Sequence, residues 1–261
     1  MTTFERRQRL MTILREQTGI LVPEVAELLG VSEGTIRNDL NSLAGLGQVR
    51  CVRGGGVLLD EQQNRSPIFA TRLMTHRSTK QSITQQAASL VKDNDSVILD
   101  SSTTSYYLAC CLKERRDLTV ITTGIESARE LAKNSSNTVI LLGGILRADG
   151  TATSVPMGEQ FLDDYHIKTA FVSCSGFTPL GGLTDVDIYE ALIKRKLITS
   201  SGSTVALIDA SKFGRMDLTA FARTDQITHL FTDRGLSPEW VKILKQAGVP
   251  FTLCGEKTEP V

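Results

Sequence analysis

Short apolar segments alternate with helical segments beyond residue 80, and this alternation limits the possible folds more than any other feature of the sequence. Strands are expected near 96–100, 118–122, 138–142, 169–174, 204–208, 229–232 and 250–253. Helices are expected near 80–91, 188–198 and 238–247, and between the first strands. Apolar strands that alternate with helices are typical of a mostly parallel sheet with helices on its faces. The sequence therefore predicts an α/β fold for this part of the chain.

The first 58 residues show a different pattern, with apolar side chains at helical spacing. Three groups share this spacing: Phe4, Leu10, Ile13 and Leu14; Val25, Leu28 and Leu29; and Ile36, Leu40 and Leu43. Pro23 suits the first turn of the second helix, Gly30 suits its end, and Ser32 suits the N-cap of the third. Two β-prone segments around three glycines at 54–56 then predict a hairpin. Together these elements predict a winged helix-turn-helix.

A polar, turn-rich segment at 60–67 separates the two patterns. We expect a winged helix-turn-helix domain over 1–59, a linker over 60–77, an α/β domain over 78–255 and a short tail over 256–261. A chain of 261 residues is long enough for two domains of these sizes.

Composition and charge exclude several classes of protein. No apolar run approaches the roughly 18 residues of a membrane span, and the N-terminus has no signal segment, so we expect a cytoplasmic protein with no membrane partner.

The five cysteines have no C-x-x-C spacing and the three histidines have no ligand spacing, so neither a metal site nor a disulfide framework is expected. Nucleotide-binding glycine motifs are absent from the sequence, and we assign no cofactor and no catalytic residue. The 29 basic and 29 acidic residues cancel, so any nucleic-acid site must be local.

The third helix carries the side chains that would read DNA. The second helix of a helix-turn-helix places its N-terminal residues in the major groove. Arg37 can bind guanine and Asn38 adenine, whereas Ile36 and Leu40 face inward. The expected DNA contacts are Ser32, Glu33, Thr35, Arg37 and Asn38 on the helix, and Arg50 and Arg53 on the wing. Because the first 58 residues hold seven arginines, six acidic residues and no lysine, a protein-interaction module is the alternative.

In the α/β domain, polar or glycine-rich loops follow several expected strands, and such loops form the ligand sites of parallel sheets. The loop from Asp100 to Thr104 opens a helix, so it would either cradle a phosphate or simply cap that helix. Other loops contribute Thr122 and Thr123; Gly143, Gly144 and Arg147; Gly181 to Asp185; and Lys212 with its positive charge. Glu190 and Lys194 lie four residues apart on a helix, a spacing typical of a surface ion pair.

These motifs resemble those of the DeoR family of bacterial transcriptional regulators over essentially the whole chain. Residues 31–40, V-S-E-G-T-I-R-N-D-L, are similar to the family's V-S-x-x-T-I-R-R-D-L, and residues 50–55 look like its wing motif R-x-H-G-G. Asn38 stands in place of the usual arginine, and Arg53 in place of the usual histidine. The resemblance implies that the chain binds double-stranded operator DNA.

The resemblance also implies a sensor domain that is related in fold to ribose-5-phosphate isomerase and binds phosphorylated sugars. Residues 100–104 are similar to the family's D-S-G-T-T, with Ser102 in place of the glycine, and residues 209–214 are similar to D-S-S-K-F-G. A serine at this position would penalise a positive φ and a close approach of the ligand. The implied effector-binding residues are Lys80, Asp100, Ser101, Ser102, Thr103, Thr104, Thr122, Thr123, Gly143, Gly144, Arg147, Asp185, Glu190, Lys194 and Lys212.

Two functions fit these observations. The first is a repressor of a carbohydrate-utilisation operon whose operator affinity is modulated by a phosphorylated sugar; the sequence does not separate a repressor from an activator. A palindromic operator read by two-fold related subunits requires at least a dimer. The second is a sugar-phosphate isomerase-like enzyme with an accessory N-terminal module. Related isomerases carry a glutamate base in an R-E-K-I stretch, where this chain has K-R-K-L at 194–197, so we expect no enzyme; Glu190 is the candidate substitute.

Overall fold

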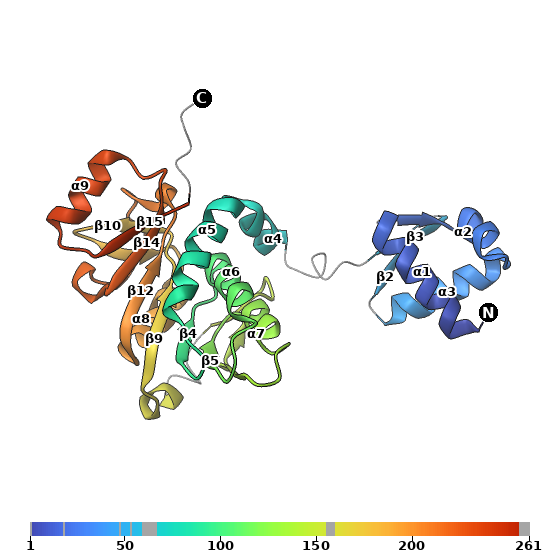
Figure 1. Ribbon diagram of the computed structural model, residues 1–261, viewed down its shortest axis with the longest axis horizontal. Coiled ribbons are helices and arrows are strands. Elements are labelled where there is room, and N and C mark those ends of the chain that lie inside the picture. Colours follow the sequence, from blue (N-terminus) through green and yellow to red (C-terminus); the bar gives the residue numbers. More distant parts are fainter. Residues whose placement is uncertain are drawn as a thin grey trace. The chain divides into compact units, whose positions relative to one another are not determined.

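The computed structural model describes residues 2–17, 19–46, 48–52, 54–58, 67–154 and 160–255. The chain divides into two compact units, Met1–Ser66 and Pro67–Val261 (Figure 1). Among the described residues, no helix is both long enough and apolar enough to span a membrane.

The first unit is a winged helix-turn-helix, as the sequence predicts. Its elements are α1 (Thr3–Gln17), β1 (Gly19–Leu21), α2 (Val22–Leu29), α3 (Glu33–Gly45), β2 (Val49–Val52) and β3 (Gly55–Leu58). The three strands form an antiparallel sheet in the order β1-β3-β2. Leu10, Leu14, Ile36 and Leu40 are at most 2% exposed and form the centre of the core. Phe4 shares the helical spacing of Leu10 and Leu14 but is 73% exposed, because it lies in the first turn of α1, away from the packed face.

Local sequence signals explain where these elements begin and end. Gly30 ends α2 in the left-handed conformation with φ 64°, and the Ser32 side chain caps α3 by accepting the amide of Thr35. A Cβ at Gly55 would lie 1.9 Å from the carbonyl oxygen of Ile20, so the wing requires glycine there. The glycine run at 54–56 is therefore set by close packing as well as by turn formation.

A buried ion pair joins α1 to α3. Asp39 is 2% exposed and accepts hydrogen bonds from Arg6 at 2.5 Å and Arg7 at 2.9 Å. Burial alone would raise the pKa of this carboxyl, but the bonds from the two arginines hold the pKa below its usual value. The ionised carboxylate thus holds α3 in place.

The second unit is built on a seven-stranded sheet in which all strands are parallel. Its order is β15-β14-β12-β9-β4-β5-β6. The strands are β4 (Ser96–Leu99), β5 (Thr119–Thr122), β6 (Thr138–Leu141), β9 (Ile167–Val172), β12 (Ser201–Leu207), β14 (His229–Asp233) and β15 (Phe251–Cys254). All seven coincide with strands expected from the sequence, which confirms the predicted α/β fold.

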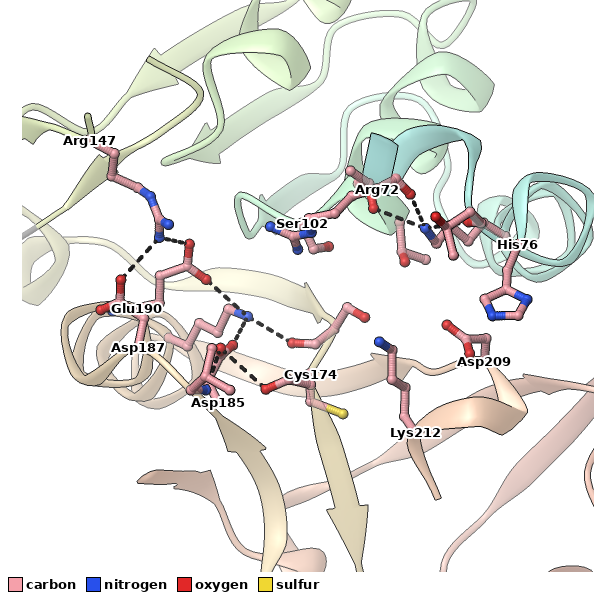
Figure 2. A pocket seen from close by; sticks show the side chains of 18 residues that line it. Arg72, His76, Ser102, Arg147, Cys174, Asp185, Asp187, Glu190, Asp209 and Lys212 are labelled. Atoms are coloured by element: carbon pink, nitrogen blue, oxygen red, sulfur yellow. Dashed lines mark hydrogen bonds and ion pairs between the residues drawn. The ribbon is translucent and has the colours of Figure 1, made fainter. Parts of the chain in front are cut away.

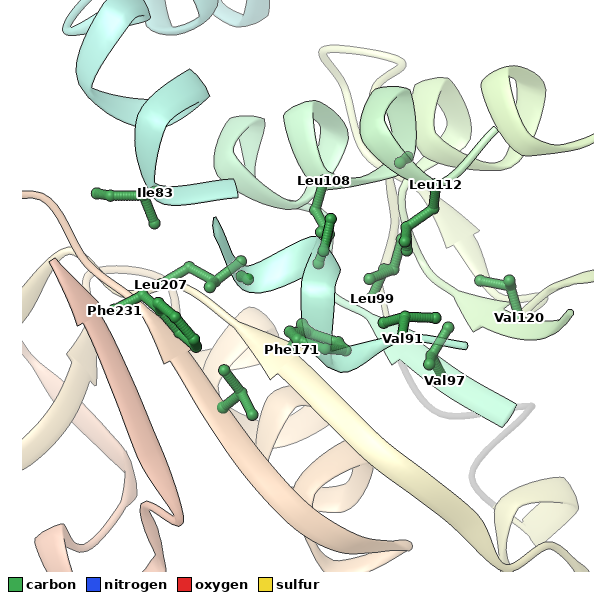
Figure 3. Close-up of a cluster of buried hydrophobic side chains, with 14 of the residues drawn as sticks. Ile83, Val91, Val97, Leu99, Leu108, Leu112, Val120, Phe171, Leu207 and Phe231 are labelled. Carbon is green, nitrogen blue, oxygen red and sulfur yellow. The ribbon is translucent and has the colours of Figure 1, made fainter. Parts of the chain in front are cut away.

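Helices cover both faces of this sheet. They are α4 (Pro67–Met74), α5 (Arg77–Ala87), α6 (Thr103–Leu112), α7 (Ile125–Leu131), α8 (Ile188–Thr199) and α9 (Pro238–Gln246). Val97 and Leu99 of β4 point to one face, where they pack with Leu108 of α6 (Figure 3). Ile98 points to the opposite face and packs with Leu197 of α8. This alternation explains why the strands are apolar on both sides.

Two smaller sheets lie outside the parallel core. Strands β10 (Gly176–Thr178), β11 (Gly182–Asp185) and β13 (Thr219–Ala222) form an antiparallel sheet, and β7 (Ile145–Leu146) pairs with β8 (Thr153–Ser154). The segment 181–185 was expected to be a loop, but most of it is strand β11, because its backbone pairs on both sides. Short paired segments of this kind have no long apolar run to mark them.

The boundary of the second unit differs from the expected one. Residues 60–77 were assigned to a linker, but Pro67–Met74 form helix α4. Phe69 is 3% exposed and makes an edge-to-face contact with Tyr106 of α6, with ring centroids 5.9 Å apart. The second unit therefore begins at Pro67 instead of residue 78.

Candidate functional site

The outward face of α3 carries most of the expected DNA-reading side chains. Glu33, Arg37 and Asn38 are exposed, and Thr35 is half-buried with its hydroxyl 2.9 Å from that of Ser32. Arg37 forms an ion pair with Glu33 at 2.6 Å, one turn earlier on the same helix. The guanidinium of Arg37 is therefore bound to a carboxylate in the DNA-free protein.

Of the wing arginines, Arg50 lies on β2, whereas Arg53 lies outside the described residues. The sequence analysis did not single out Asn41, which is exposed one turn after Arg37 and accepts a hydrogen bond from the Cys51 thiol of the wing at 3.5 Å. Its position at i+4 from Arg37 is the signal that could have found it.

A cavity of about 290 Å³ lies at the carboxyl ends of β4, β9 and β12 (Figure 2). Nine of the expected effector-binding residues line it: Lys80, Ser102, Thr103, Thr104, Arg147, Asp185, Glu190, Lys194 and Lys212. Nine further lining residues were not in the expected set: Arg72, Thr75, His76, Ser173, Cys174, Ser175, Val186, Asp187 and Asp209. Asp209 and residues 173–175 follow strands, so the same reasoning about strand ends could have found them. Arg72, Thr75 and His76 were missed because they lie in the segment taken for a linker.

Lys194 lies at the centre of the polar network of this cavity. Its side chain is 3% exposed, and Nζ donates to Asp185 at 2.7 Å and to the carbonyl of Ser173 at 2.9 Å, with Asp100 at 3.2 Å. Burial by itself would lower the pKa of this lysine, but the carboxylates of Asp100, Asp185 and Glu190 raise it above its usual value. The expected ion pair between Lys194 and Glu190 is present at 3.7 Å, but its expected surface location is wrong, because the side of α8 that bears Lys194 is covered by the rest of the domain.

Asp185 and Cys174 respond to the same surroundings in opposite ways. Burial alone would raise the pKa of Asp185, but the adjacent Lys194 ammonium holds it below its usual value. Burial raises the pKa of the Cys174 thiol to about 12, so this cysteine stays protonated. The network therefore contains an ionised carboxylate and an unreactive thiol.

Arg147, which follows β7, forms ion pairs with two carboxylates at the N-terminal end of α8. Its guanidinium pairs with Glu190 and lies 3.4 Å from Asp187, the residue that caps α8 (Figure 2). Ser101, which does not line the cavity, donates to Glu190 at 3.5 Å. This end of the cavity thus places the guanidinium of Arg147, a hydrogen-bond donor, beside the carboxylates of Asp187 and Glu190, which are acceptors.

Asp100 organises the loop before α6 and does not line the cavity. It is fully buried, and its carboxylate accepts hydrogen bonds from the amides of Ser102 and Ser173 and from the hydroxyl of Ser105. All of these partners belong to the protein, so Asp100 positions the loop and does not reach a ligand.

Ser102 meets no conformational penalty. Its φ is −72° and its ψ is 154°, an extended conformation that any residue adopts, and its hydroxyl caps α6 by accepting the amide of Ser105 at 3.0 Å. The expected penalty for a positive φ is therefore wrong at this position, because the loop turns without one. Among the described residues, the amides of Thr103 and Thr104 have no hydrogen-bond acceptor, as is usual for the first turn of a helix.

Two cations face the same end of the cavity. No described residue lies within hydrogen-bond or ion-pair distance of the Arg72 guanidinium or of Nζ of Lys212. Lys80 differs from both, because its ammonium donates to the carbonyls of Arg72 and Thr75 and to the hydroxyl of Thr103. The arrangement offers two charged donors and two backbone amides to an anion.

The remaining expected residues lie outside this cavity. Thr122 is fully buried and its hydroxyl accepts the amide of Gly124, whereas the carbonyl of Thr123 accepts the amide of Thr153. Gly143 and Gly144 are exposed beyond the end of β6. These four positions shape the neighbouring loops, and the structure does not bring them together with the charged cavity.

Comparison with known proteins identifies both units. Residues 6–62 match the DeoR-like helix-turn-helix domain, and residues 75–234 match the DeoR C-terminal sensor domain. The HTH-type transcriptional regulator GolR of Listeria innocua is 36% identical over 250 residues, covering 96% of this chain and 98% of that protein.

Two other relatives have names that state what they regulate. The glycerol-3-phosphate regulon repressor of Haemophilus influenzae is 29% identical over 97% of both chains. The L-fucose operon activator of the same species is 31% identical and covers 92% of this chain and 96% of that protein.

Among solved structures, ribose 5-phosphate isomerase A of Methanocaldococcus jannaschii aligns with a TM-score of 0.40 and 17% identity, over 53% of this chain and 55% of that one. Relatives of full matching length are named as transcriptional regulators, and the sensor-domain match covers more than half of the chain. The chain therefore belongs to the DeoR family of transcriptional regulators.

Proposed function

We propose that this protein represses a carbohydrate-utilisation operon and that a phosphorylated sugar, bound in the cavity of the second unit, modulates its affinity for operator DNA. The observation that carries the proposal is the anion-binding end of the cavity. Arg72 and Lys212 have no partner among the described residues there, and Thr103 and Thr104, whose amides open α6, line the same cavity. A phosphate group would satisfy both the charges and the amides.

The opposite end of the cavity suits the sugar. Asp187 and Glu190 supply carboxylate oxygens that accept hydrogen bonds from hydroxyl groups, and Arg147 supplies donors. An anion at one end and several hydroxyls at the other describe a sugar phosphate better than a nucleotide, because the described lining residues include no phenylalanine, tyrosine or tryptophan for a base to stack on.

The first unit provides the DNA contacts. We assign base and phosphate contacts to Ser32, Glu33, Thr35, Arg37 and Asn38 of α3, with Arg50 and Arg53 on the wing. A palindromic operator would be read by a dimer or a larger homo-oligomer in the cytoplasm, where the DNA lies.

The isomerase-like alternative is less well supported. An aldose–ketose isomerase needs a carboxylate that is available to take a proton. Glu190, the candidate base, is instead paired with Arg147 and lies 3.7 Å from Lys194. The relatives named above are regulators, and one of them is named as an activator, so the sign of regulation is tested separately from ligand binding.

A thermal-shift screen of the purified chain against sugar phosphates and their unphosphorylated parents tests the effector. Binding raises stability by RT ln(1 + [L]/Kd), so an effector at 100 times its Kd would add about 2.7 kcal/mol. We expect a shift with a phosphorylated sugar and none with its parent. If no sugar phosphate shifts the melting temperature, the proposed effector class is wrong.

Two matched variants separate the sites. With an operator selected in vitro from random DNA, Arg37→Ala should weaken binding by about 1–3 kcal/mol, because it removes a bidentate base contact.

Lys212→Ala should leave operator affinity unchanged and reduce the response to the sugar phosphate, because it removes a charge that faces the ligand. Fluorescence anisotropy with labelled DNA measures both. A Lys212→Ala protein that loses operator affinity and stays fully inducible would contradict the site assignment.

A further inference from the structure

The wall of the cavity includes the start of the second unit. Helix α4 begins at Pro67, where the chain arrives from the DNA-binding unit, and the turn after it supplies Arg72, Thr75 and His76 to the cavity. His76 has a left-handed backbone, with φ 52°, which is costly for a residue other than glycine. The ligand site thus contacts the segment through which the two units are covalently joined.

Lys80 fastens this turn to the anion-binding loop. Its ammonium, 6% exposed, donates to the carbonyl of Arg72 at 2.6 Å, to that of Thr75 at 2.9 Å and to the hydroxyl of Thr103 at 3.2 Å. An ammonium has three protons to donate, and these three acceptors use them all. Lys80 therefore holds the C-terminal end of α4 against the N-terminus of α6 and has no proton left for a ligand.

Contacts along α4 fasten it to the same helix. The hydroxyl of Tyr107 donates to the carbonyl of Leu73 at 2.9 Å, and Phe69 packs against Tyr106. Both tyrosines belong to α6, so α4 docks on one helix whose first turn is the anion-binding loop. A change at that turn is thereby connected to α4 by direct contacts.

Charges of both signs surround the Lys80 ammonium. Burial disfavours its charged form, the Asp209 carboxylate favours it, and the charges of Arg72 and Lys212 disfavour it. A phosphate dianion beside these groups would attract all three cations. Anion binding would therefore make the electrostatic contribution to α4 docking more favourable.

We propose that the docking of α4 depends on whether the cavity is occupied. A bound phosphate is held by Arg72 together with the α6 amides, and Lys80 is the positioning residue that couples phosphate binding to the docking of α4. This inference rests on the proposed function, because it assigns the regulation of the same site. For this coupling, the ligand must bind more tightly to the state in which α4 is docked. The docking of α4 then affects the DNA-binding unit through the chain that enters α4.

Hydrogen exchange of the full-length protein, with and without inorganic phosphate, tests the proposal. We expect phosphate to slow exchange of the α4 amides at least about fivefold, the lower end of typical coupling between sites. Exchange at Lys245 and Gln246, the C-terminal end of α9 (Pro238–Gln246), is the internal control and should not change. The contact of this helix with Phe213, beside the lining residue Lys212, is made by Trp240 near its start. Thermal shift in the same samples reports binding independently.

Three variants and a control locate the coupling. Lys80→Met removes a charge that lines the cavity, so it should weaken phosphate binding less than Arg72→Gln does and yet abolish the protection of α4. Arg72→Gln should weaken both binding and protection. Tyr107→Phe removes the tie to Leu73, outside the cavity lining, so it should speed α4 exchange and, because the ligand favours the docked state, weaken phosphate binding only slightly. Arg77→Gln, an exposed residue at the start of α5 that does not line the cavity, should behave as wild type.

Different results would overturn different claims. If phosphate shifts the melting temperature of the wild-type protein but leaves α4 exchange unchanged, the inference about α4 is wrong and the effector site stands. If Lys80→Met loses phosphate binding as completely as Lys212→Ala, Lys80 is a ligand and the positioning role is wrong. If neither phosphate nor any sugar phosphate binds, the proposed function fails, and the inference fails with it.

Discussion

Lys80 and Lys194 are buried lysines of one cavity, yet their surroundings move their pKa values in opposite directions. Burial lowers the pKa of Lys80 to about 8; Asp209 opposes this shift, and the charges of Arg72 and Lys212 add to it. Lys194 is more deeply buried, but its three carboxylate neighbours more than offset the loss of hydration. The sequence predicted neither outcome, because the spacing of Glu190 and Lys194 indicates adjacency on a helix and says nothing of which face is covered.

The shift at Lys80 predicts a dependence of stability on pH. The pKa of Lys80 is about 8 in the folded protein, whereas an ordinary exposed lysine, as in the unfolded chain, has a pKa of 10.5. Between these two pH values the unfolded chain therefore binds more protons than the folded protein. The free energy of unfolding should therefore gain a contribution that increases from pH 8 to 10.5, as the buried ammonium loses its charge. Urea unfolding of the wild-type and Lys80→Met proteins across this range measures it as a difference between the two. A difference that stays constant with pH would show that Lys80 keeps its ordinary pKa.

At the scale of elements, sequence periodicity predicts the large features and misses the small ones. The seven strands of the parallel sheet are apolar on both faces and lie between helices, so each is visible in the sequence. Strand β11 and the β7–β8 hairpin are short and pair locally, so they leave no periodic signal. Helix α4 directly follows the polar segment at 60–67 and was assigned with it to the linker. About half of the cavity lining was predicted, since it lies on loops after strands. The part on α4 and the turn after it was not.

Helix α6 gives a prediction about Ser102, which stands in place of the family's glycine in the turn that we propose to bind phosphate. Ser102 has a negative φ, so Ser102→Gly should not improve binding of a sugar phosphate, and affinity should stay within about threefold of wild type. Ser102→Ala, which removes the cap but keeps a side chain, should cost about 1 kcal/mol of stability, whereas the glycine variant should cost a few tenths. Thermal shift with and without ligand measures both effects. A tenfold gain in affinity for the glycine variant would mean that the serine side chain obstructs the ligand.

At the scale of the whole molecule, the helix-turn-helix and the sensor domain are separate units, each with its own hydrophobic core. One helix-turn-helix would read only half of a palindromic site, so in the proposed mode of recognition operator affinity depends on how many chains assemble.

We therefore expect sedimentation velocity of the full-length chain, at the concentrations used for DNA binding, to give a mass of at least two chains. Arg37→Ala should sediment identically, because Arg37 lies on the exposed face of α3 assigned to DNA. A purely monomeric chain that still binds its operator tightly would contradict the two-fold model of recognition.

The early start of the second unit has a practical consequence for engineering. Chimaeric regulators are made by fusing the sensor of one protein to the DNA reader of another, and the fusion point decides whether the hybrid responds. A junction placed after α4 would discard Phe69 and Arg72, leaving Tyr106 uncovered and the cavity without one of its cations. Such a hybrid would recognise its new operator and be insensitive to inducer. A junction before Pro67 keeps the sensor whole, so biosensors built from this chain should be cut there.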